Sequence, residues 1–584
     1  MLLQVISIAP MAFLAIAATT YIITTLQYRL FFLRQHGSNG KHQPVPIPYK
    51  IPWVGHTIGF LTQEPGSFFL GLLRWHARER GASKIVLGGQ TTYIIFSHNA
   101  VQTLYKLKRN VASRENFHKT FLTKATGMSE DDHDKLISEA KTARQEVHLH
   151  QEFMLRQSGV NELTRAFIKF LQEQIDPKTG KMPDEVCEET ELYAWLRPMM
   201  FRASVTAFMG RYILDVYQDL DVDFAHFDQG ILDLVFGVSK IFRPRSYAAQ
   251  AKILDGFNRW IQTVDAKTGG RVPDPHDPED EWEPFWGSRF SRARQALWIE
   301  REMSQSGRAS IELGLIFGLN SNAIPATGWM LMHILDPKQP HLLPRVLDEI
   351  QRAVVPDTDS PGSNINLNVH QLVSSPLLQS IFHEVLRVYV DVLVARELHQ
   401  DVELPLDDKH GARTLKFANN SVLLAPSIAS HYDSTYFAEP PANVFYAERF
   451  LEPVHPEKPD GEYIFSSGSS SSRMWPWGGG KSMCPGRVFA KQEILAAVAL
   501  VLWTFDIDAA DKEKYRIPPF SRAYPGSGTI VPGFYVSKNS ASSTAALRHA
   551  SSQTLPNAFQ HSSPAKFSLK DRVERGTQNK PRLM

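Results

Sequence analysis

From Met474 to Arg487 the sequence reads MWPWGGGKSMCPGR, and this stretch decides the fold. The three glycines at 478–480 permit backbone angles that other residues avoid, and they let a flat ligand approach the main chain. Cys484 follows them and stands just before a helical pattern over residues 491–505. Unpaired backbone N–H groups and the dipole at a helix start favour a thiolate. The stretch therefore predicts that Cys484 is a thiolate that a flat ligand can approach.

A lone thiolate in a glycine-rich loop, with no second protein ligand nearby in the sequence, suits haem iron better than zinc. The alternative is a buried free cysteine, which is the commonest state of a lone thiol. The other cysteine, Cys187, follows Asp184 and Glu185, whose charges should raise the pKa of its thiol and leave it inert. Two cysteines also exclude a disulfide scaffold and indicate a reducing compartment.

The spacing Trp477-x-x-Gly480-x-x-x-Cys484-x-Gly486 resembles the haem-binding signature of the cytochromes P450, with Trp where most members have Phe. The resemblance implies the cytochrome P450 fold, which is mainly α with small β-sheets. It also implies heme b as the cofactor, with Cys484 as the axial thiolate ligand of the iron. Trp477, Gly478, Gly480 and Gly486 are then the other residues of the haem-binding loop.

Composition and periodicity agree with a large helical protein. The chain has 584 residues, of which 43% are hydrophobic and 21% charged, so it can bury a large core and is neither disordered nor fibrous. The net charge of +2 gives no indication of nucleic-acid binding. Hydrophobic periodicity predicts helices over residues 160–174, 342–355 and 371–390, and short strands over residues 84–87, 92–96 and 421–424.

Two further motifs occur in the order found in that family. Glu384-Val-Leu-Arg387 resembles its Glu-x-x-Arg helix, and Ala447-Glu-Arg-Phe resembles its downstream Pro-Glu-Arg-Phe segment. The resemblance implies that Glu384, Arg387 and Arg449 form a buried structural triad. By itself, a Glu–Arg pair three residues apart on a helix is usually an exposed contact worth at most ~1 kcal/mol.

The resemblance also assigns haem-propionate binding to Arg396, nine residues after Arg387. The alternative for Arg396 is a surface arginine at the end of a strand. At Ser482 many family members have an Arg or His that contacts a propionate, and this chain has neither. Lys481 and Arg473 are the candidates to replace it.

A long apolar helix is predicted over residues 309–335, and Pro325 inside it removes a backbone donor and should kink it. Most P450 monooxygenases have an acid followed by Thr here, and these relay protons during oxygen activation. The register of Ile-Pro-Ala-Thr places Ser321 and Asn322 at these positions, so the resemblance makes them the catalytic candidates. This departure resembles the branch of the sterol 7α- and 12α-hydroxylases and prostacyclin synthase. The alternative is that Asn322 bonds the backbone group that Pro325 frees.

The N-terminal segment has the length of a membrane anchor. Residues 2–26 carry no charge, and as a helix at ~1.5 Å per residue they cover a ~30 Å hydrocarbon core. Arg29 and Arg34 follow, so the positive-inside rule places the remainder in the cytosol. We expect a single transmembrane anchor over residues 1–28 in the endoplasmic reticulum, with the catalytic domain facing the cytosol. The alternative is a cleaved signal peptide.

Three further regions follow the anchor. Closely spaced prolines and basic residues predict a semi-rigid hinge over residues 29–56, which resembles the hinge after the anchor in the P450 family. Residues 57–535 show no internal repeat and form the predicted haem-thiolate catalytic domain. Residues 536–584 are rich in Ser and Ala, carry eight basic and two acidic residues, and are predicted to be a disordered basic tail.

The resemblance implies a membrane-bound monooxygenase that oxidises a lipophilic, steroid- or terpenoid-like substrate with O2, plausibly in the biosynthesis of a specialised metabolite. The sequence contains no dinucleotide fingerprint, so electrons should come from a separate NADPH-cytochrome P450 reductase. Substrate contacts are expected within residues 227–265. Two alternatives remain open at this point: a reductase-independent isomerase or dehydratase of a peroxide, as prostacyclin synthase is, and a non-catalytic haem-binding protein.

Overall fold

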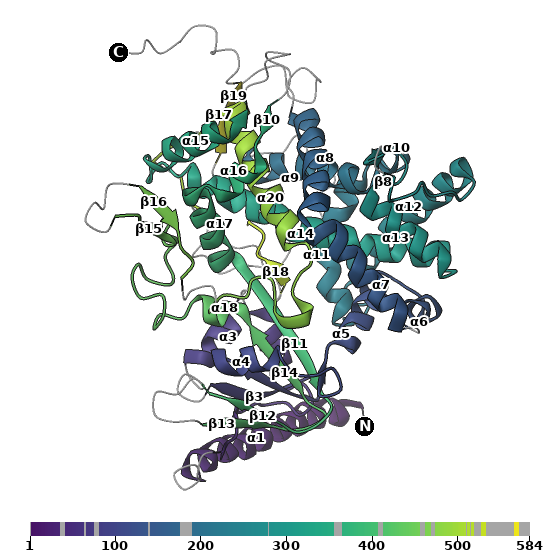
Figure 1. The fold of residues 1–584 in the computed structure, drawn as a ribbon. Coiled ribbons are helices and arrows are strands. Elements are labelled where there is room, and N and C mark those ends of the chain that lie inside the picture. The colour runs from purple at the N-terminus through teal and green to yellow at the C-terminus, as the bar shows by residue number, and fades with distance from the viewer. Residues whose placement is uncertain are drawn as a thin grey trace.

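The computed structural model is mainly helical with small sheets, as the sequence predicts (Figure 1). A long helix, α14 (Gln305–Ile334), crosses the helical part, and a sheet covered by α1 (Leu2–Arg34) lies at one end. The structure describes residues 2–34, 41–63, 66–74, 81–137, 140–175, 190–277, 280–355, 365–406, 413–455, 462–468, 473–509, 511–513, 515–518, 527–532 and 566–571. Cys187 lies outside these ranges.

Helix α14 is the centre of the helical part. It packs against α9 (Leu192–Met209), α12 (Pro244–Thr268) and α20 (Arg487–Thr504). Most of its side chains are buried on all sides, which explains why the sequence is apolar around the whole helix rather than along one stripe. Pro325 lies inside the helix, which continues past it to Ile334.

Two of the three periodic helices are confirmed, and one is wrong. The helix predicted over residues 160–174 lies within α8 (Gln157–Ile175). The helix predicted over residues 342–355 is α15 (Leu342–Ala353), which begins at the predicted residue and ends two residues earlier. The stretch predicted as one helix over residues 371–390 is two helices, α16 (Val369–Ser374) and α17 (Pro376–Tyr389). The break falls at the residue before Pro376, whose backbone is extended because a following proline disfavours the helical conformation.

The largest sheet has the strand order β18-β11-β14-β4-β3-β2, with β5 paired to β11. All three predicted strands belong to it. Strand β11 follows directly after α17, so this junction connects the central helices to the sheet. The strands are Val45–Pro46 (β2), Ala82–Leu87 (β3), Gln90–Ile95 (β4), Ala112–Ser113 (β5), Val390–Leu398 (β11), Val422–Pro426 (β14) and Ser527–Thr529 (β18).

The predicted boundary between anchor and hinge at residue 28 is wrong, because α1 continues as one helix to Arg34. The rings at Tyr28, Phe31 and Phe32 pack against a buried cluster of the sheet end, and this packing favours the extra turns. Part of the expected hinge is also a sheet strand, since Val45 pairs with Ser83. The proline-rich segment is therefore held in place by the sheet.

The prediction of a disordered tail is wrong for one segment. Strand β19 lies antiparallel between β17 and β6, and it joins the helical part through this sheet. Its sequence, KFSLKD, alternates apolar and polar residues with the period of a strand, but it is too short to stand out in a serine-rich tail. The catalytic domain therefore includes residues beyond 535, and the rest of the tail lies outside the described ranges. The strands are Thr190–Glu191 (β6), Phe505–Ala509 (β17) and Lys566–Asp571 (β19).

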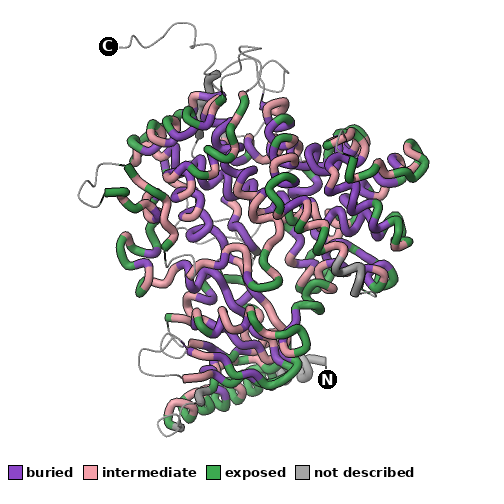
Figure 2. The backbone as a smooth tube through the Cα atoms, viewed as in Figure 1, coloured by how far each residue is buried: buried purple, intermediate pink, exposed green. Residues whose placement is uncertain are grey.

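The core runs through the middle of the helical part, as Figure 2 shows. Its largest cluster joins residues of α8, α9, α14, α17 and α20, while a smaller cluster lies beneath the sheet. Three tryptophans of the larger cluster, Trp260, Trp286 and Trp329, are fully buried. The segments that precede and follow Cys484 are therefore attached to well-packed helices.

Candidate active site

The Cys484 loop closes on itself through backbone hydrogen bonds. The Cys484 N–H donates to the Trp477 carbonyl at 2.9 Å, and the Gly478 N–H donates to the Trp475 carbonyl at 3.0 Å. A short 3-10 turn, Gly480–Ser482, connects the two halves, and α20 begins at Arg487. The thiol is thereby held at the start of a long buried helix.

Different structural constraints require glycine at the different glycine positions of this loop. Gly478 and Gly480 have φ values of 70° and 61°, in the left-handed region that strains other residues. A Cβ on Gly479 would lie 2.2 Å from the ring of Tyr105, and one on Gly480 would lie 2.6 Å from the Tyr105 carbonyl oxygen. The loop therefore packs its main chain against Tyr105, which is possible only without side chains.

The environment of Cys484 differs from the expectation that the helix start would favour a thiolate. Burial raises the pKa of the Cys484 thiol, and this effect exceeds the opposing hydrogen bonds from the N–H groups of Gly486 and Arg487 and the charge of Arg487. The protein alone therefore favours the neutral thiol. A bound metal cation supplies the charge that deprotonates a coordinating thiol, so this buried sulfur suits a metal rather than a free nucleophile.

The donor set fits haem better than a metal held by several side chains. Across the described ranges, His, Cys, Asp and Glu nowhere gather in groups of three or more that could hold a metal ion. A structural zinc site needs four protein ligands, whereas haem iron takes its in-plane ligands from the porphyrin and needs one axial residue. Cys484 is the described free cysteine.

The structure brings the predicted triad together. The Arg387 guanidinium forms a two-pronged contact with the Glu384 carboxylate at 2.8 and 2.7 Å. The Nε of Arg449 donates to both oxygens of the same carboxylate at 3.1 Å. The side chains of Glu384 and Arg387 are fully buried and that of Arg449 is 5% exposed. A buried group of three charges is stable only when each is paired and hydrogen-bonded, and here each is.

A histidine that the sequence analysis missed connects this triad to the Cys484 loop. Arg387 donates from Nη1 to the His431 carbonyl at 2.9 Å, and the Trp475 N–H donates to Nε2 of the His431 ring at 3.2 Å. Burial lowers the pKa of His431 to about 3, so the ring is neutral and can accept this bond. Only the folded chain reveals this role, since His431 lies in no recognisable motif.

Arg396 lies opposite a second arginine that the sequence analysis also missed. Strand β5 pairs with β11 through Ser113 and Glu397, so Arg114 comes to lie beside Arg396. Burial and the charge of Arg114 both lower the pKa of Arg396. The buried hydroxyl of Tyr105, whose ring packs against the Cys484 loop, has no hydrogen-bond partner among the described residues.

Two facing cations and an unsatisfied hydroxyl next to the Cys484 loop are the features of a site for an anionic group. The carboxylates at the edge of a haem have this chemistry, so the residues fit the group. Of the two candidates proposed to replace the residue at 482, Arg473 lies over the Tyr436 ring at 5.2 Å, and Lys481 is exposed. Arg114 is therefore the better partner for Arg396.

Helix α14 has an open face near its centre. Gly318 is exposed although the helix is otherwise mostly buried, and a Cβ built on it would meet nothing within 4 Å. Asn322, one turn further along, is partly exposed. Its carboxamide oxygen accepts a hydrogen bond from the Thr529 N–H of β18 at 2.8 Å, rather than bonding within the helix at the proline.

Ser321 contacts a different element from its neighbour Asn322. Its hydroxyl donates to Asp228 Oδ1 at 2.6 Å, across the contact between α14 and α11 (Leu220–Val235). Asp228 lies in the segment 227–265 that was expected to contact substrate. The two predicted catalytic residues thus lie on adjacent sides of α14 and have separate partners.

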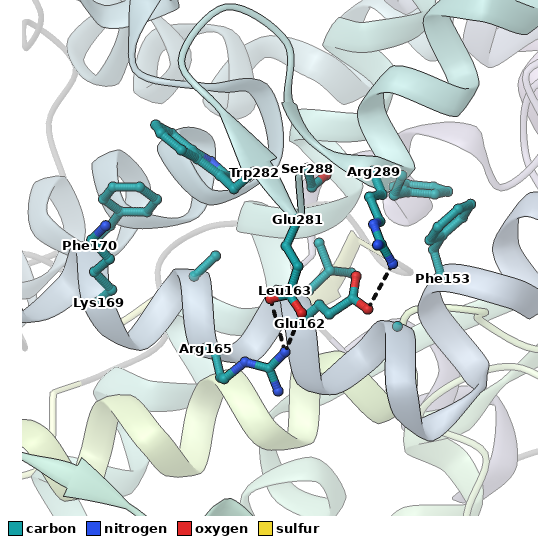
Figure 3. Close-up of a pocket in the computed structure, with 13 residues that line it drawn as sticks. Phe153, Glu162, Leu163, Arg165, Lys169, Phe170, Glu281, Trp282, Ser288 and Arg289 are labelled. Atoms are coloured by element: carbon teal, nitrogen blue, oxygen red, sulfur yellow. Dashed lines mark hydrogen bonds and ion pairs between the residues drawn. The ribbon is translucent and has the colours of Figure 1, made fainter. Parts of the chain in front are cut away.

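A cavity of about 190 Å³ lies between α8, the β7–β8 hairpin and α13 (Arg289–Glu300) (Figure 3). Its charged residues pair with one another: Arg165 with Glu281 at 3.0 Å and Arg289 with Glu162 at 3.2 Å. None of the predicted site residues lines it. The strands of the hairpin are Trp282–Glu283 (β7) and Gly287–Ser288 (β8).

Comparison with known proteins identifies the relatives of this chain. Residues 313–527 match the family model described as cytochrome P450. The chain is 26% identical to the cytochrome P450 monooxygenase efuG of Hormonema carpetanum over 88% of this chain and 92% of that protein. It is 24% identical to a 7-alpha-hydroxycholest-4-en-3-one 12-alpha-hydroxylase of Oryctolagus cuniculus, over 82% and 90% of the two chains.

The fold has a solved relative as well. The structure of retinoic acid bound cyanobacterial CYP120A1 superposes with a TM-score of 0.57, over 91% of this chain and all of that chain, at 17% identity. The family match includes α14 from Leu313 onward, the triad and the Cys484 loop, and the relatives extend the similarity over most of the chain. The match to this family model and the similarity to named cytochrome P450 monooxygenases over most of the chain support a haem monooxygenase of the cytochrome P450 type.

Proposed function

We propose that this enzyme is anchored in the endoplasmic reticulum membrane and hydroxylates a lipophilic substrate of steroid or terpenoid type, in the biosynthesis of a specialised metabolite. Heme b is held by Cys484, and electrons come from NADPH through a separate cytochrome P450 reductase. One observation carries the proposal. Cys484 lies in a main-chain loop at the start of α20, and hydrogen bonds connect this loop through His431 to the buried triad.

The residues around the haem have separate tasks. Cys484 would bind the iron through its thiolate, and haem bound there would supply the redox chemistry that activates O2. Trp477, Gly478, Gly480 and Gly486 form the loop that lies against the ring. The glycines carry no side chain that would block its approach.

Residues at the edge of the haem and residues in the core of the protein hold the haem in its orientation. Arg396 and Arg114 pair with its carboxylates, and the Tyr105 hydroxyl supplies a third donor. The contacts that support this are the facing arginines and the unsatisfied hydroxyl beside the loop. Glu384, Arg387 and Arg449 contribute folding stability and haem retention rather than chemistry, because hydrogen bonds and ion pairs occupy their charges.

Asn322 and Ser321 manage protons on the open face of α14. Asn322 presents a carboxamide beside Gly318, where the helix leaves room for substrate and oxygen. Its hydrogen bond to Thr529 fixes the orientation of the carboxamide. A fixed polar group at a space where charge develops stabilises the transition state without reorganising.

The substrate class rests on the relatives and on the surroundings of the site. The similarity to a hydroxylase named for a cholestenone substrate extends over most of both chains, and it supports a rigid, apolar ring system here. The segments next to α14 are rich in apolar side chains: Phe224, Phe227, Ile231 and Leu234 of α11 are all buried. Such surroundings favour a lipophilic molecule.

Membrane association has two supports. Residues Met11–Leu33 form a helix that is long and apolar enough to span a bilayer. Apolar side chains are also exposed beyond this helix: Ile241 and Phe242 of the catalytic domain are 85% and 74% exposed, and Trp53 of the proline-rich segment is 82% exposed. The contact between the rings of Phe60 and Phe236 at 5.8 Å joins the α11–α12 loop to the segment after α1. We call Trp53, Ile58, Phe236, Ile241 and Phe242 the apolar patch.

The proposal is tested by product analysis. Microsomes that contain the full-length enzyme are incubated with NADPH, isotopically labelled O2 and a panel of steroids and terpenoids, with and without the reductase. The expected result is a product with one labelled oxygen atom, formed only when reductase and NADPH are present. A product that forms at full rate from a peroxide without reductase would establish the isomerase alternative instead.

A further inference from the structure

Helix α11 carries four acidic side chains that contact neighbouring elements, and one of them differs from the other three. Asp221 pairs with Arg202 of α9 at 2.6 Å. Asp223 pairs with Lys252 at 2.8 Å, and Asp233 pairs with Arg243 at 3.2 Å. Asp228 forms no ion pair within the described residues, and its hydrogen bond comes from the Ser321 hydroxyl at 2.6 Å. Among the described residues, Asp228 is therefore the acidic side chain of this set that contacts a hydroxyl and no cation.

The surroundings of Asp228 favour retention of that proton. Desolvation by the surrounding protein raises its pKa to about 6, and this outweighs the opposing effects of the Ser321 hydrogen bond and of Arg197. Arg197 and Tyr193, both on α9, are the other charged or titratable groups that act on it. Part of Asp228 remains accessible. Asp228 is therefore partly exposed beside the contact between α11 and α14.

The contact between Asp228 and Ser321 lies next to the open face of α14. Gly318 and Ser321 are three residues apart, so they lie on one side of the helix. Gly318 borders open space, and Ser321 lies one turn beyond it with its hydroxyl on Asp228. The serine is thus placed between the open face and the acid.

We propose that Asp228 is the acid of the proton relay in this enzyme, supplied by α11 and acting through the Ser321 hydroxyl at the open face of α14. The inference rests on the proposed function, because it assumes that Ser321 serves the oxygenation site. On α14 the chain has two neutral side chains, Ser321 and Asn322, at the candidate catalytic positions. The inference therefore assigns the acid to a residue of α11.

The relay balances as a pure proton transfer. Insertion of one oxygen atom consumes one O2, two electrons and two protons, and yields one hydroxyl in the product and one water. The electrons come from NADPH through the reductase. For each proton, the Ser321 hydroxyl gives its hydrogen to the open face, and Ser321 Oγ takes the hydrogen of Asp228. Asp228 is then reprotonated from water, and no bond other than O–H changes.

The first test measures the proton itself, with no turnover. Infrared difference spectra of the haem-loaded, full-length enzyme are recorded between about pH 4.5 and about pH 8, in a range that brackets the pKa of Asp228. As the pH rises, the wild type should lose one protonated-carboxyl band with a midpoint near pH 6. Asp228→Asn should lack this band at every pH. Ser321→Ala should move the midpoint upward, because the serine hydrogen bond opposes protonation.

The second test measures what the proton does. NADPH oxidation and hydrogen peroxide release are followed in vesicles of phosphatidylcholine that contain the enzyme and the reductase, with cholest-4-en-3-one as the probe. Asp228→Asn should oxidise NADPH at least about tenfold more slowly below pH 6 and release a larger share of the oxygen as peroxide, since a general acid contributes at least about 10²-fold. The wild-type rate should fall as the pH rises through about 6, and the rate of Asp228→Asn should not.

The chain offers a matched control. Asp233 lies on the same helix and also accepts a hydrogen bond from a serine, Ser246, at 2.7 Å, but it faces α12. Asp233→Asn should keep the carboxyl band, the pH profile and the peroxide share of the wild type. Asp228→Glu and Ser321→Thr should restore part of the rate, which excludes an effect of misfolding.

The outcomes separate the inference from the proposed function. If Asp228→Asn has the pH profile and peroxide share of the wild type, Asp228 only ties α11 to α14 and the inference is wrong. If the wild type itself does not respond to reductase and NADPH, the proposed function fails, and with it the need for a relay. The infrared titration then still reports whether Asp228 and Ser321 share a proton.

Discussion

At the scale of single residues, the Glu384 carboxylate is the most constrained group in the site. It accepts hydrogen bonds from Arg387, from Arg449 and from the Tyr446 N–H at 2.9 Å. Glu384→Gln leaves two buried guanidinium groups without their counter-charge, which should lower the free energy of unfolding by ~3–5 kcal/mol. Urea denaturation with haem absorbance as the probe measures this.

A surface pair provides the comparison for that variant. Asp348 and Arg352 contact each other on α15 with side chains 59% and 64% exposed. Asp348→Asn should cost at most ~1 kcal/mol, because an exposed ion pair is screened by water. Equal losses for Asp348→Asn and Glu384→Gln would mean that the triad does not stabilise the core.

His431 makes stability depend on pH. Its pKa is about 3 in the fold and ~6.5 in the unfolded chain, so between these values only the unfolded chain takes up the proton. Stability should therefore fall as the pH drops from ~6.5 towards ~3. His333 and His383, whose pKa values burial lowers to about 3 and about 4, act in the same direction.

The His431 contribution is measured with a variant that keeps the acceptor. His431→Gln can still accept the Trp475 N–H but cannot be protonated. Between about pH 7.5 and about pH 5 the wild type should lose about 2 kcal/mol of unfolding free energy through His431. The variant should not lose this contribution. A difference between wild type and variant that stays constant over this range would show that His431 does not titrate on unfolding.

At the scale of elements, local motifs were predictable from the sequence and long-range contacts were not. The Cys484 loop and the Glu384–Arg387 pair depend on spacings of a few residues, so the sequence contains them directly. Arg114 reaches Arg396 only through the register of β5 on β11, and Asp228 reaches Ser321 only through the packing of α11 on α14. Such contacts depend on the whole fold.

Strand β19 shows the same limit at a larger distance. Its sequence has the alternation of a strand, but its partners β17 and β6 lie far away in the chain. A pattern of six residues in a serine-rich tail does not identify these partners. Composition describes the average of a segment. It therefore hides a short element that is stabilised by pairing elsewhere.

The contribution of β19 can be measured by two truncations. A chain that ends at residue 565 lacks the strand and leaves the edges of β17 and β6 unpaired. It should unfold at a lower urea concentration and aggregate more readily, because unpaired edges invite intermolecular pairing. A chain that ends at residue 572 keeps the strand and should behave like the full-length protein. If the two truncated proteins were equally stable, the pairing of β19 would not support the fold.

At the scale of the whole molecule, α1 and the apolar patch should share the attachment to the membrane. Without residues 1–34 the protein should still float with phosphatidylcholine vesicles, because the patch remains. The further change of Ile241 and Phe242, the two most exposed large apolar residues of the α11–α12 loop, to Asp should release it. Binding scales with the apolar area that enters the interface.

The control for that experiment changes apolar residues elsewhere on the surface. Val147→Asp and Ile299→Asp replace exposed apolar side chains outside the patch, and the truncated chain with these changes should remain bound. Release by both pairs of substitutions would indicate a general effect of added negative charge. Complete release on removal of α1 alone would show that the patch does not contact the membrane.

The central claim, that Cys484 is the axial ligand of haem iron, is tested most directly by the absorption spectrum of the reduced, carbon-monoxide-bound protein. Thiolate donation produces a red-shifted Soret band, which the wild type and Cys187→Ser should both show. Cys484→Ser should lack this band, because a neutral hydroxyl cannot match the electron donation of a thiolate. A Cys484→Ser protein that keeps both the red-shifted band and the activity would contradict the assignment.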